Sequence, residues 1–299
     1  MANPSVTLFI NPTAGRGKAG QRLQHIEAIL DSEGVEFRTM TSRGVGDLER
    51  LVKNRIEGGN SDIIVAGGDG SIHEAVNGIM RAGGQARLGV IPTGTGNDFA
   101  KACGLSLDWE LTARKLAARL VQETVGRKID VGRMNDRFFA NGAGVGFDAR
   151  VSKAARAFRW PIGNLVYLIA IVRCMIDGIA TPEITIEADT LQWRGPVTLT
   201  NVSNGPWVGG MFHIAPMAKN DDGRLELVVA DPVSRLRLFS LLPKLIRGEH
   251  MNETEITHSG AQRITIESSA AMPSHLDGEI QALATRFEFE VLPGALTLL

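Results

Sequence analysis

Three glycine-rich turns constrain the fold of this 299-residue chain most strongly, because each directly follows a short run of apolar residues. The turns are Asn11-Pro12-Thr13-Ala14-Gly15-Arg16-Gly17-Lys18, Gly67-Gly68-Asp69-Gly70-Ser71 and Pro92-Thr93-Gly94-Thr95-Gly96-Asn97-Asp98-Phe99. Strands are predicted before them at residues 6–10, 62–66 and 88–91, and also at 35–40, while 21–30, 48–56, 72–80 and 99–103 have helical spacing. This alternation predicts a parallel sheet, with the turns at the carboxyl ends of its strands, where open α/β sheets bind ligands.

We call the edge of the sheet formed by these three turns the rim. It suits a phosphorylated nucleotide, because glycine lets backbone N–H groups approach a ligand and a helix N-terminus offers unpaired donors. Two familiar templates fit the first turn poorly. Residues 15–20 match GxGxxG, but four residues separate the strand from the first glycine and no acidic residue ends the second strand. A Walker A loop is excluded because Pro12 stands where its first glycine belongs and Ala19 where Ser or Thr is needed.

Two acidic residues of the second turn have both a structural and a chemical interpretation. Ser71 and Glu74 have the spacing of a capping box, which would only begin the helix, and a functional role for Glu74 is the equally open alternative. Asp69 stands between glycines, where phosphates would lie, and is expected to orient a metal–phosphate group or the attacking hydroxyl. The structural alternative for Asp69 is an acid favoured by the helix dipole.

The third turn combines hydroxyl groups with a candidate helix cap. Asn97 or Asp98 is expected to cap a helix that begins at Phe99. Capping does not account for the residues before them, since Thr93 and Thr95 offer hydroxyl donors suited to a phosphate.

After about residue 126 the pattern changes to short strands separated by Gly, Asn, Asp or Pro turns. The predicted strands are 129–134, 137–141, 183–188, 196–203, 224–230, 263–268 and 287–292, interrupted by helical insertions at 149–179 and 233–248. We therefore expect an antiparallel β-sandwich after the α/β domain. The predicted domains are 1–128 and 129–299, with the extreme C-terminus expected to pack back on the first.

Charge, cysteine content and apolar runs limit the partners and the cellular compartment that we expect for this chain. The net charge of −1 gives no whole-molecule attraction to nucleic acid or anionic lipid. Cys103 and Cys174 lie far apart, which argues against a disulfide framework and favours a reducing, cytoplasmic setting. The N-terminal residues do not have the pattern of a signal peptide, and the longest apolar run, Leu165–Val172, is far below the roughly 20 residues that span a bilayer.

Taken together, the three turns and two later segments resemble the diacylglycerol-kinase catalytic domain family, in particular the bacterial soluble lipid kinases of the DgkB/YegS type. The resemblance rests on Asn11-Pro12-x-x-Gly15-x-Gly17-Lys18, Gly67-Gly68-Asp69-Gly70-Ser71-x-x-Glu74-x-x-Asn77-Gly78, Pro92-x-Gly94-Thr95-x-Asn97-Asp98-Phe99-Ala100, Ala215-Pro216-x-Ala218-x-x-x-Asp222-Gly223-x-Leu225-Glu226-Leu227 and Asp277-Gly278-Glu279. It implies an ATP-dependent, Mg²⁺-assisted lipid kinase with an α/β nucleotide domain, a β-sandwich domain and an active site between them.

The resemblance also implies roles for individual residues. The segments that hold ATP would be Asn11, Pro12, Thr13, Ala14, Gly15, Thr41, Gly67, Gly68, Asp69, Gly70, Ser71, Ile72, His73 and Thr95. Glu279 would be the general base with Asp277 beside it, and Asp69 and Asp98 complete the candidate catalytic set. A metal site would comprise Lys219, Asp222 and Arg224, the first and last through backbone carbonyls. Taken alone, Asp277-Gly278-Glu279 and Asp221-Asp222-Gly223 are each typical of a turn.

Two basic segments with large apolar residues, 149–176 and 232–248, suit peripheral contact with an anionic membrane. Their members include Arg150, Lys153, Arg156, Phe158, Arg159, Trp160, Arg173, Arg235, Arg237, Leu238, Phe239, Leu241, Lys244 and Arg247. The alternative is a pair of amphipathic helices packed on the sandwich. Two other functions remain open, an NAD kinase, which would share residues 67–70, and a non-catalytic nucleotide sensor. The lipid acceptor and the oligomeric state, a homodimer included, are not fixed by the sequence.

Overall fold

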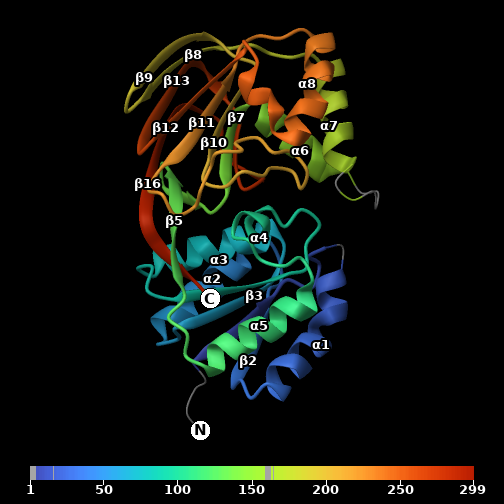
Figure 1. Ribbon diagram of the computed structural model, residues 1–299, viewed down its shortest axis with the longest axis vertical. Coiled ribbons are helices and arrows are strands. Elements are labelled where there is room, and N and C mark those ends of the chain that lie inside the picture. Colours follow the sequence, from blue (N-terminus) through green and yellow to red (C-terminus); the bar gives the residue numbers. More distant parts are fainter. Residues whose placement is uncertain (1–4, 16, 159–162, 164) are drawn as a thin grey trace. The chain divides into compact units, whose positions relative to one another are not determined.

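The computed structural model describes residues 5–15, 17–158, 163 and 165–299. Arg16, Arg159 and Trp160 lie outside the described residues. The chain divides into two compact units, the first comprising 1–130 with 294–299 and the second comprising 131–293. The first is an α/β unit with parallel strands and the second an antiparallel β-sandwich, which confirms the predicted fold class (Figure 1).

The first unit is built on a parallel sheet in the order β2-β1-β3-β4. Its strands are β1 (Val6–Ile10), β2 (Phe37–Thr41), β3 (Asp62–Gly67) and β4 (Arg87–Pro92). Its helices are α1 (Lys18–Ser32), α2 (Asp47–Glu57), α3 (Asp69–Arg81), α4 (Asp98–Ala102) and α5 (Trp109–Val121). The last residues of the chain add to the sheet, because Thr297 and Leu298 pair with Arg87 and Leu88 of β4.

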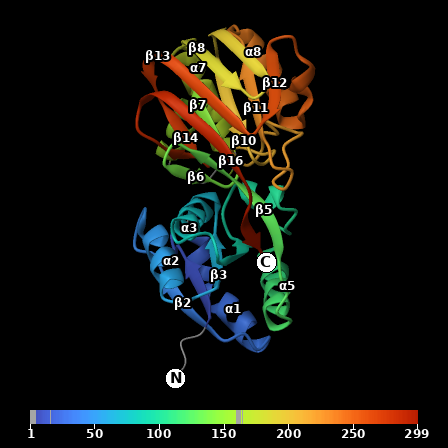
Figure 2. The same cartoon turned by 90° about the vertical axis from the view of Figure 1, so that its left-hand side faces the viewer.

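Helices cover both faces of this sheet, with α1 and α5 on one side and α2 and α3 on the other (Figure 2). Fully buried strand residues such as Ile10, Ile64 and Ile91 form one core with α1 and α5. Helix α5 was not predicted from the sequence. It begins after Asp108, whose carboxylate accepts hydrogen bonds from the backbone N–H groups of Glu110 and Leu111.

The second unit contains two sheets packed face to face. One has the order β12-β11-β10-β7-β14-β15, and the other contains β16-β13-β8-β9 with β5 on β16 and β6 on β5. The strands are β5 (Arg127–Met134), β6 (Arg137–Phe139), β7 (Gly142–Gly146), β8 (Glu183–Ala188), β9 (Leu191–Pro196), β10 (Leu199–Ser203), β11 (Leu225–Ala230), β12 (Ile256–Ala261), β13 (Arg263–Met272), β14 (Ser274–Leu276), β15 (Glu279–Ile280) and β16 (Ala284–Leu298). Several of these strands were not predicted, β7 among them.

Strand β7 was missed because glycine alternates along it. Ala143 and Val145 face the sandwich core, whereas Gly142, Gly144 and Gly146 face the opposite side of the sheet. Glycine weakens an isolated strand, so the sequence Gly-Ala-Gly-Val-Gly does not have the pattern of one.

Helices α6 (Phe147–Ala157), α7 (Leu165–Ile176) and α8 (Arg235–Arg247) cover the glycine-bearing face of the six-stranded sheet, followed by the 3₁₀ turn η1 (Glu249–Asn252). On β11, Leu227 and Val229 join the sandwich core while Val228 lies under the helices. Both faces of this sheet are therefore buried. Within the described part of the chain, every helix is too short or too polar to cross a bilayer.

Candidate functional site

The three glycine-rich turns of the first unit are in direct backbone contact. A Cβ atom built on Gly15 would lie 2.2 Å from the carbonyl oxygen of Thr93, and one built on Gly94 would lie 2.4 Å from Cα of Gly68. Gly15 also has a φ of +59°, a conformation that side chains other than glycine rarely adopt. Glycine is thus required at these positions because the first and second turns both rest against the third.

The second turn begins α3, but the predicted capping box does not form. The helix starts at Asp69, and no side chain caps it. The Glu74 carboxylate instead accepts the backbone N–H groups of Gly46 at 2.9 Å and Leu48 at 3.0 Å, so it caps the N-terminus of α2. The spacing of Ser71 and Glu74 matches a capping box, but in the fold the Glu74 carboxylate bonds to α2 and not to its own helix.

Within the described residues, the first-turn amides of Gly70 and Ser71 donate no backbone or side-chain hydrogen bond. Amides of this kind at a helix N-terminus form an anion site, because the helix dipole adds to their hydrogen-bonding capacity. The start of α3 therefore retains donors for a phosphate. In contrast, the amides of Ala19 and Gly20 at the start of α1 bond to the carbonyls of Ala14 and Pro12.

Asp69 links the second turn to the third, because its Oδ1 accepts the backbone N–H of Phe99 at 3.1 Å. The predicted cap of the third turn is wrong in detail. The helix begins at Asp98, and the Asn97 side chain bonds back to Gly94 without capping it. Asp98 is buried and forms an ion pair of 2.6 Å with Lys101. Both candidate carboxylates thus have structural partners within this rim.

The other residues expected to hold ATP differ in accessibility. Thr95 is exposed, and Thr41 is an exposed residue at the end of β2. Asn11 shapes the first turn by accepting hydrogen bonds from the backbone N–H and hydroxyl of Thr13. The side chains of Ser71, Ile72 and His73 are buried. These three could therefore contribute to a ligand site through the backbone, not as exposed side chains.

The rim fits a nucleotide phosphate on one further observation. The Thr93 hydroxyl oxygen is fully buried and has no hydrogen-bond partner among the described residues. A buried polar atom without a partner is costly and calls for a ligand or water. Together with the free amides of α3, this donor set matches the needs of a phosphate group.

In the second unit, Asp277 and Gly278 form the turn between β14 and β15, with φ angles of +50° and +84°. The predicted hairpin turn is therefore present. The Asp277 carboxylate accepts three backbone N–H groups, those of Ala140 at 2.9 Å, Asn141 at 2.8 Å and Gly142 at 3.0 Å. Both oxygens are committed to the backbone, so Asp277 is placed to fix the turn on which Glu279 stands.

Glu279 has a cationic partner that the sequence did not indicate. Arg156 of α6 forms an ion pair with the Glu279 carboxylate, and its guanidinium also donates to the carbonyl of Gly278 at 3.3 Å. The pair is partly exposed. A carboxylate held in this way keeps a defined orientation at the start of β15.

A buried His–Asp pair lies beneath the same turn and was also missed from the sequence. His275 Nε2 lies 3.1 Å from Oδ2 of Asp148, and its Nδ1 accepts the backbone N–H of Gly278 at 3.2 Å. Because Nδ1 accepts, the ring proton is assigned to Nε2, facing Asp148. A Cβ on Gly144 would lie 2.3 Å from Asp148 Oδ2, so the glycine on β7 makes room for the pair.

The environment of Asp148 favours its charged form. Burial opposes ionisation, but the facing His275 and the hydrogen bond from Asn201 outweigh it and hold the pKa of Asp148 below its ordinary value. Asp148 and His275 are distant in sequence, and only the pairing of β7 with β14 brings them together.

The predicted metal site lies in the loop before β11. Asp222 is exposed, and its Oδ1 accepts the backbone N–H of Arg224 at 3.1 Å, as expected for a turn. Carboxylate and carbonyl oxygens are suitable ligands for Mg²⁺ or Ca²⁺. Among the described residues, no cluster of three or more His, Cys, Asp and Glu side chains could hold a metal ion. A site here would therefore depend on the backbone carbonyls of Lys219 and Arg224.

The basic face of α8 is largely neutralised by the acidic segment that follows it. Arg237 pairs with Glu253 and Glu255, and Lys244 pairs with Glu253. The hydrogen bond from Arg237 lowers the pKa of Glu255 to about 2. The apolar residues Leu238 and Leu241 point inward rather than to solvent. Ion pairs and core packing therefore use these side chains, whereas Arg235, Leu236 and Phe239 near the start of the helix are exposed.

Comparisons with known proteins cover both units. Residues 5–134 match the model of the diacylglycerol kinase catalytic domain, and residues 142–299 match that of the YegS C-terminal NAD kinase beta sandwich-like domain. The chain is 30% identical to a diacylglycerol kinase of Mycobacterium tuberculosis over 98% of this chain and 94% of the relative. It is 31% identical to the diacylglycerol kinase of Bacillus subtilis over 91% and 88% of the two chains. A solved structure from Bacillus anthracis (strain Sterne), described provisionally as a diacylglycerol kinase, has a TM-score of 0.80 at 26% identity, covering 98% of this chain and 96% of that one.

Proposed function

Because the chain belongs to the diacylglycerol kinase family, we propose that it transfers the γ-phosphate of ATP to the hydroxyl group of a lipid. The acceptor would be diacylglycerol or a related glycerolipid or sphingoid base. The observation that carries the proposal is the contact of three glycine turns at the carboxyl ends of β1, β3 and β4, which leaves free amides at the start of α3. Phosphoryl transfer needs such positioning and charge neutralisation rather than a covalent intermediate.

A kinase of this family uses ATP and a divalent cation, and we assign the nucleotide to the rim of the first unit. The first turn, Thr41, residues 67–73 and Thr95 would surround it, with the amides of Gly70 and Ser71 and the Thr93 hydroxyl directed to phosphate. Mg²⁺, when bound, would neutralise charge on the phosphates. Asp69 and Asp98 are the carboxylates of this rim that could orient the metal–phosphate group. Asp222, with the carbonyls of Lys219 and Arg224, would hold a further cation.

Glu279 would act as the general base that accepts the proton of the attacking hydroxyl. Arg156 and Asp277 act as positioning residues, the first by pairing with the Glu279 carboxylate and the second by fixing the turn on three backbone amides. Glu279→Gln should lower kcat by about 100-fold or more while leaving ATP affinity nearly unchanged, since a general base typically contributes that much. A variant with full turnover would show that Glu279 is not the base.

A labelled-phosphate assay separates the three candidate activities. Incubation with [γ-³²P]ATP and a total lipid extract should move label into the organic phase. Label appearing on NAD instead would favour the NAD kinase alternative, for which the NAD kinase-like description of the second domain is the motivating observation. Transfer to neither acceptor, with ATP binding intact, would favour a nucleotide sensor.

We propose a cytoplasmic enzyme that meets its lipid at the inner face of the membrane. Support comes from the end of α7 and the start of α8, where Arg235 donates to the carbonyl of Ile176. Ile176 is 70% exposed and Phe239 47% exposed. Among the described residues, Arg173 and Arg235 form no ion pair, so they remain available to anionic headgroups. Binding should be stronger to anionic than to neutral vesicles and weaken in salt, and equal binding to both would reject the surface.

A further inference from the structure

The residue before the candidate base is held on both of its peptide groups. The N–H of Gly278 donates to Nδ1 of His275 at 3.2 Å, and its carbonyl oxygen accepts a hydrogen bond from Arg156 at 3.3 Å. Gly278 has a φ of +84°, a conformation that other residues rarely adopt. Because Glu279 follows directly, the loss of either hydrogen bond would shift the backbone from which its carboxylate projects.

The imidazole that accepts the Gly278 N–H is itself oriented by a buried carboxylate. His275 is 1% exposed, and its Nε2 lies 3.1 Å from Oδ2 of Asp148 in the first turn of α6. The same oxygen accepts a hydrogen bond from Nδ2 of Asn201 at 3.1 Å. The carboxylate is therefore fixed by β10 on one side and faces the imidazole on the other.

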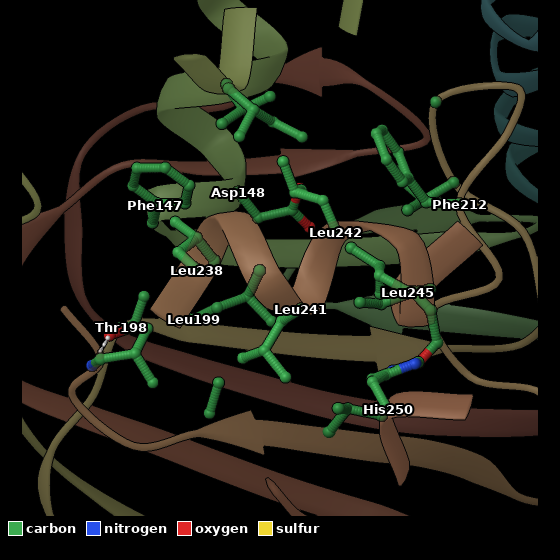
Figure 3. Close-up of a pocket in the computed structure, with 18 of the residues that line it drawn as sticks. Phe147, Asp148, Thr198, Leu199, Phe212, Leu238, Leu241, Leu242, Leu245 and His250 are labelled. Atoms are coloured by element: carbon green, nitrogen blue, oxygen red, sulfur yellow. Dashed lines mark hydrogen bonds between the residues drawn. The ribbon is translucent and has the colours of Figure 1, made fainter. Parts of the chain in front are cut away.

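Asp148 exerts its charge in apolar surroundings. It borders an apolar cavity between α6, α7 and α8 and the glycine-bearing face of the six-stranded sheet, and Figure 3 shows it there together with Phe147 and Leu242. Charges interact more strongly where the dielectric constant is low. Although burial opposes ionisation, the contacts with His275 and Asn201 keep the pKa of Asp148 below its ordinary value. The anion is thus the form that faces the imidazole.

The two contacts of His275 require the same tautomer, because a neutral imidazole has one N–H group and one lone pair. A proton on Nε2 faces the anion of Asp148 and leaves the lone pair of Nδ1 to accept the Gly278 N–H. A proton on Nδ1 would oppose the Gly278 N–H and turn a lone pair toward the anion. Only the first tautomer suits both neighbours.

From this arrangement we propose that Asp148 and His275 are positioning residues for phosphoryl transfer: the carboxylate selects the tautomer of the imidazole, and the imidazole holds the turn that carries Glu279. The inference rests on the proposed kinase function and adds to it a buried support of the general base. Both residues act through the backbone of Gly278 and not on the substrate. Because a misplacement of about 1 Å can lower a rate about 100-fold, loss of this support should appear in kcat.

Two substitutions of His275 separate its two contacts. In His275→Asn the side-chain oxygen can take the place of Nδ1 and accept the Gly278 N–H, but the contact with Asp148 is lost. In His275→Gln the amide can reach Asp148, but no acceptor remains for Gly278. Both variants remove a buried ring and should lower the free energy of unfolding. In contrast, kcat should fall about 10- to 100-fold in His275→Gln and by no more than about threefold in His275→Asn.

The labelled-phosphate assay gives kcat, and urea unfolding gives the stability of each variant. The KM for ATP should stay near its native value in both variants, since the nucleotide rim lies in the first unit. Amide exchange at Gly278 should be faster in His275→Gln than in His275→Asn. His258→Gln is the matched control, because it makes the same change at an exposed position of β12 and should leave kcat unchanged.

Nitrogen NMR of the native full chain, labelled in its histidine rings, tests the tautomer without any variant that could fail to fold. His275 should carry a proton on Nε2 and none on Nδ1 at neutral pH, with a coupling across the hydrogen bond from the Gly278 N–H to Nδ1. A proton on Nδ1, in the other tautomer or in the imidazolium, would overturn the inference.

Equal losses of kcat in His275→Asn and His275→Gln, or losses that follow the free energy of unfolding, would also overturn it. Phosphate transfer to lipid with a native kcat in His275→Gln would reject the positioning role and keep the kinase. If the native protein shows the expected tautomer but transfers phosphate to no lipid, the kinase proposal fails and the support of the turn by His275 is confirmed.

Discussion

Replacing Asp277 should destabilise the second unit strongly, because its carboxylate is the acceptor for three consecutive backbone amides. In Asp277→Ala the N–H groups of Ala140, Asn141 and Gly142 lose acceptors at 2.8–3.0 Å. An unsatisfied buried donor costs about 1–3 kcal/mol. Because these three amides are only partly buried and adjacent, water can reach them in part. We therefore expect the free energy of unfolding to fall by about 3 kcal/mol for the three losses together. Alanine at a φ of +50° adds strain that aspartate tolerates better.

Asp277→Asn provides a graded comparison. Its Oδ1 can still accept the amides of Asn141 and Gly142, while its side-chain N–H₂ would face the Ala140 N–H, so the loss should be about 1 kcal/mol. Asn also tolerates the positive φ. The exposed Asp136→Ala should change stability by less than about 0.5 kcal/mol and serves as the control.

Urea unfolding gives the free energies, and amide hydrogen exchange locates the change. Exchange at residues 140–142 should accelerate in Asp277→Ala and less in Asp277→Asn. An Asp277→Ala protein whose unfolding free energy and exchange match those of Asp136→Ala would refute the assignment of this carboxylate to the backbone. In that case the role of Asp277 would lie in the reaction and not in holding the turn.

The remaining predictions concern one helix cap, one close backbone approach and one buried imidazole. Glu74→Ala removes the cap of α2 and should cost about 1–2 kcal/mol in urea unfolding, with Glu74→Gln losing less, and equal stability of all three proteins would contradict the cap. Gly94→Ala places a Cβ 2.4 Å from Cα of Gly68 and should weaken ATP binding at least tenfold by calorimetry, so a native affinity would show that the turns do not form the nucleotide rim. Burial lowers the pKa of His250 in the folded protein. As pH drops from 7 to 5, the unfolded chain therefore takes up a proton near pH 6.5 that the folded chain does not bind. The free energy of unfolding should fall over this range, by up to about 1.4 kcal/mol per pH unit for this group. His250→Gln should flatten that slope in urea titrations at pH 5, 6 and 7, and an unchanged slope would reject the contribution.

Much of the architecture could be predicted because its signals are local. Apolar periodicity located β1, β3 and β4 and the helices after them, and Asp-Gly marked the hairpin turn at residue 277. The glycines before α1, α3 and α4 indicated close approach of the backbone, and the three turns are indeed in direct backbone contact. These features depend on residues within a few positions of one another, so a single sequence reports them directly.

Other features were decided by partners that only the fold brings together. Glu74 had the local spacing of a cap for its own helix, but it caps α2, whose Gly46 amide is 28 residues away. Because of its glycines, the central strand β7 was not predicted. The reason for a glycine at position 144 is found only in the fold, where Asp148 and His275 occupy the space that a side chain would fill. Glu253 and Glu255, which pair with Arg237 and Lys244 of α8, lie beyond residue 248, where the predicted basic segment ends.

Local patterns in the sequence were thus enough for the two-domain fold class, for most of the parallel sheet and for the places of the three glycine-rich turns. The partners of each carboxylate follow from the fold alone, because hydrogen bonds such as that from Ala140 to Asp277 join residues 137 positions apart. The apolar cavity belongs to the same category. Its walls come from three helices and three strands, and no stretch of sequence contains more than a few of its lining residues. Periodicity tells which side chains are buried, but the space left between buried side chains depends on how distant elements pack.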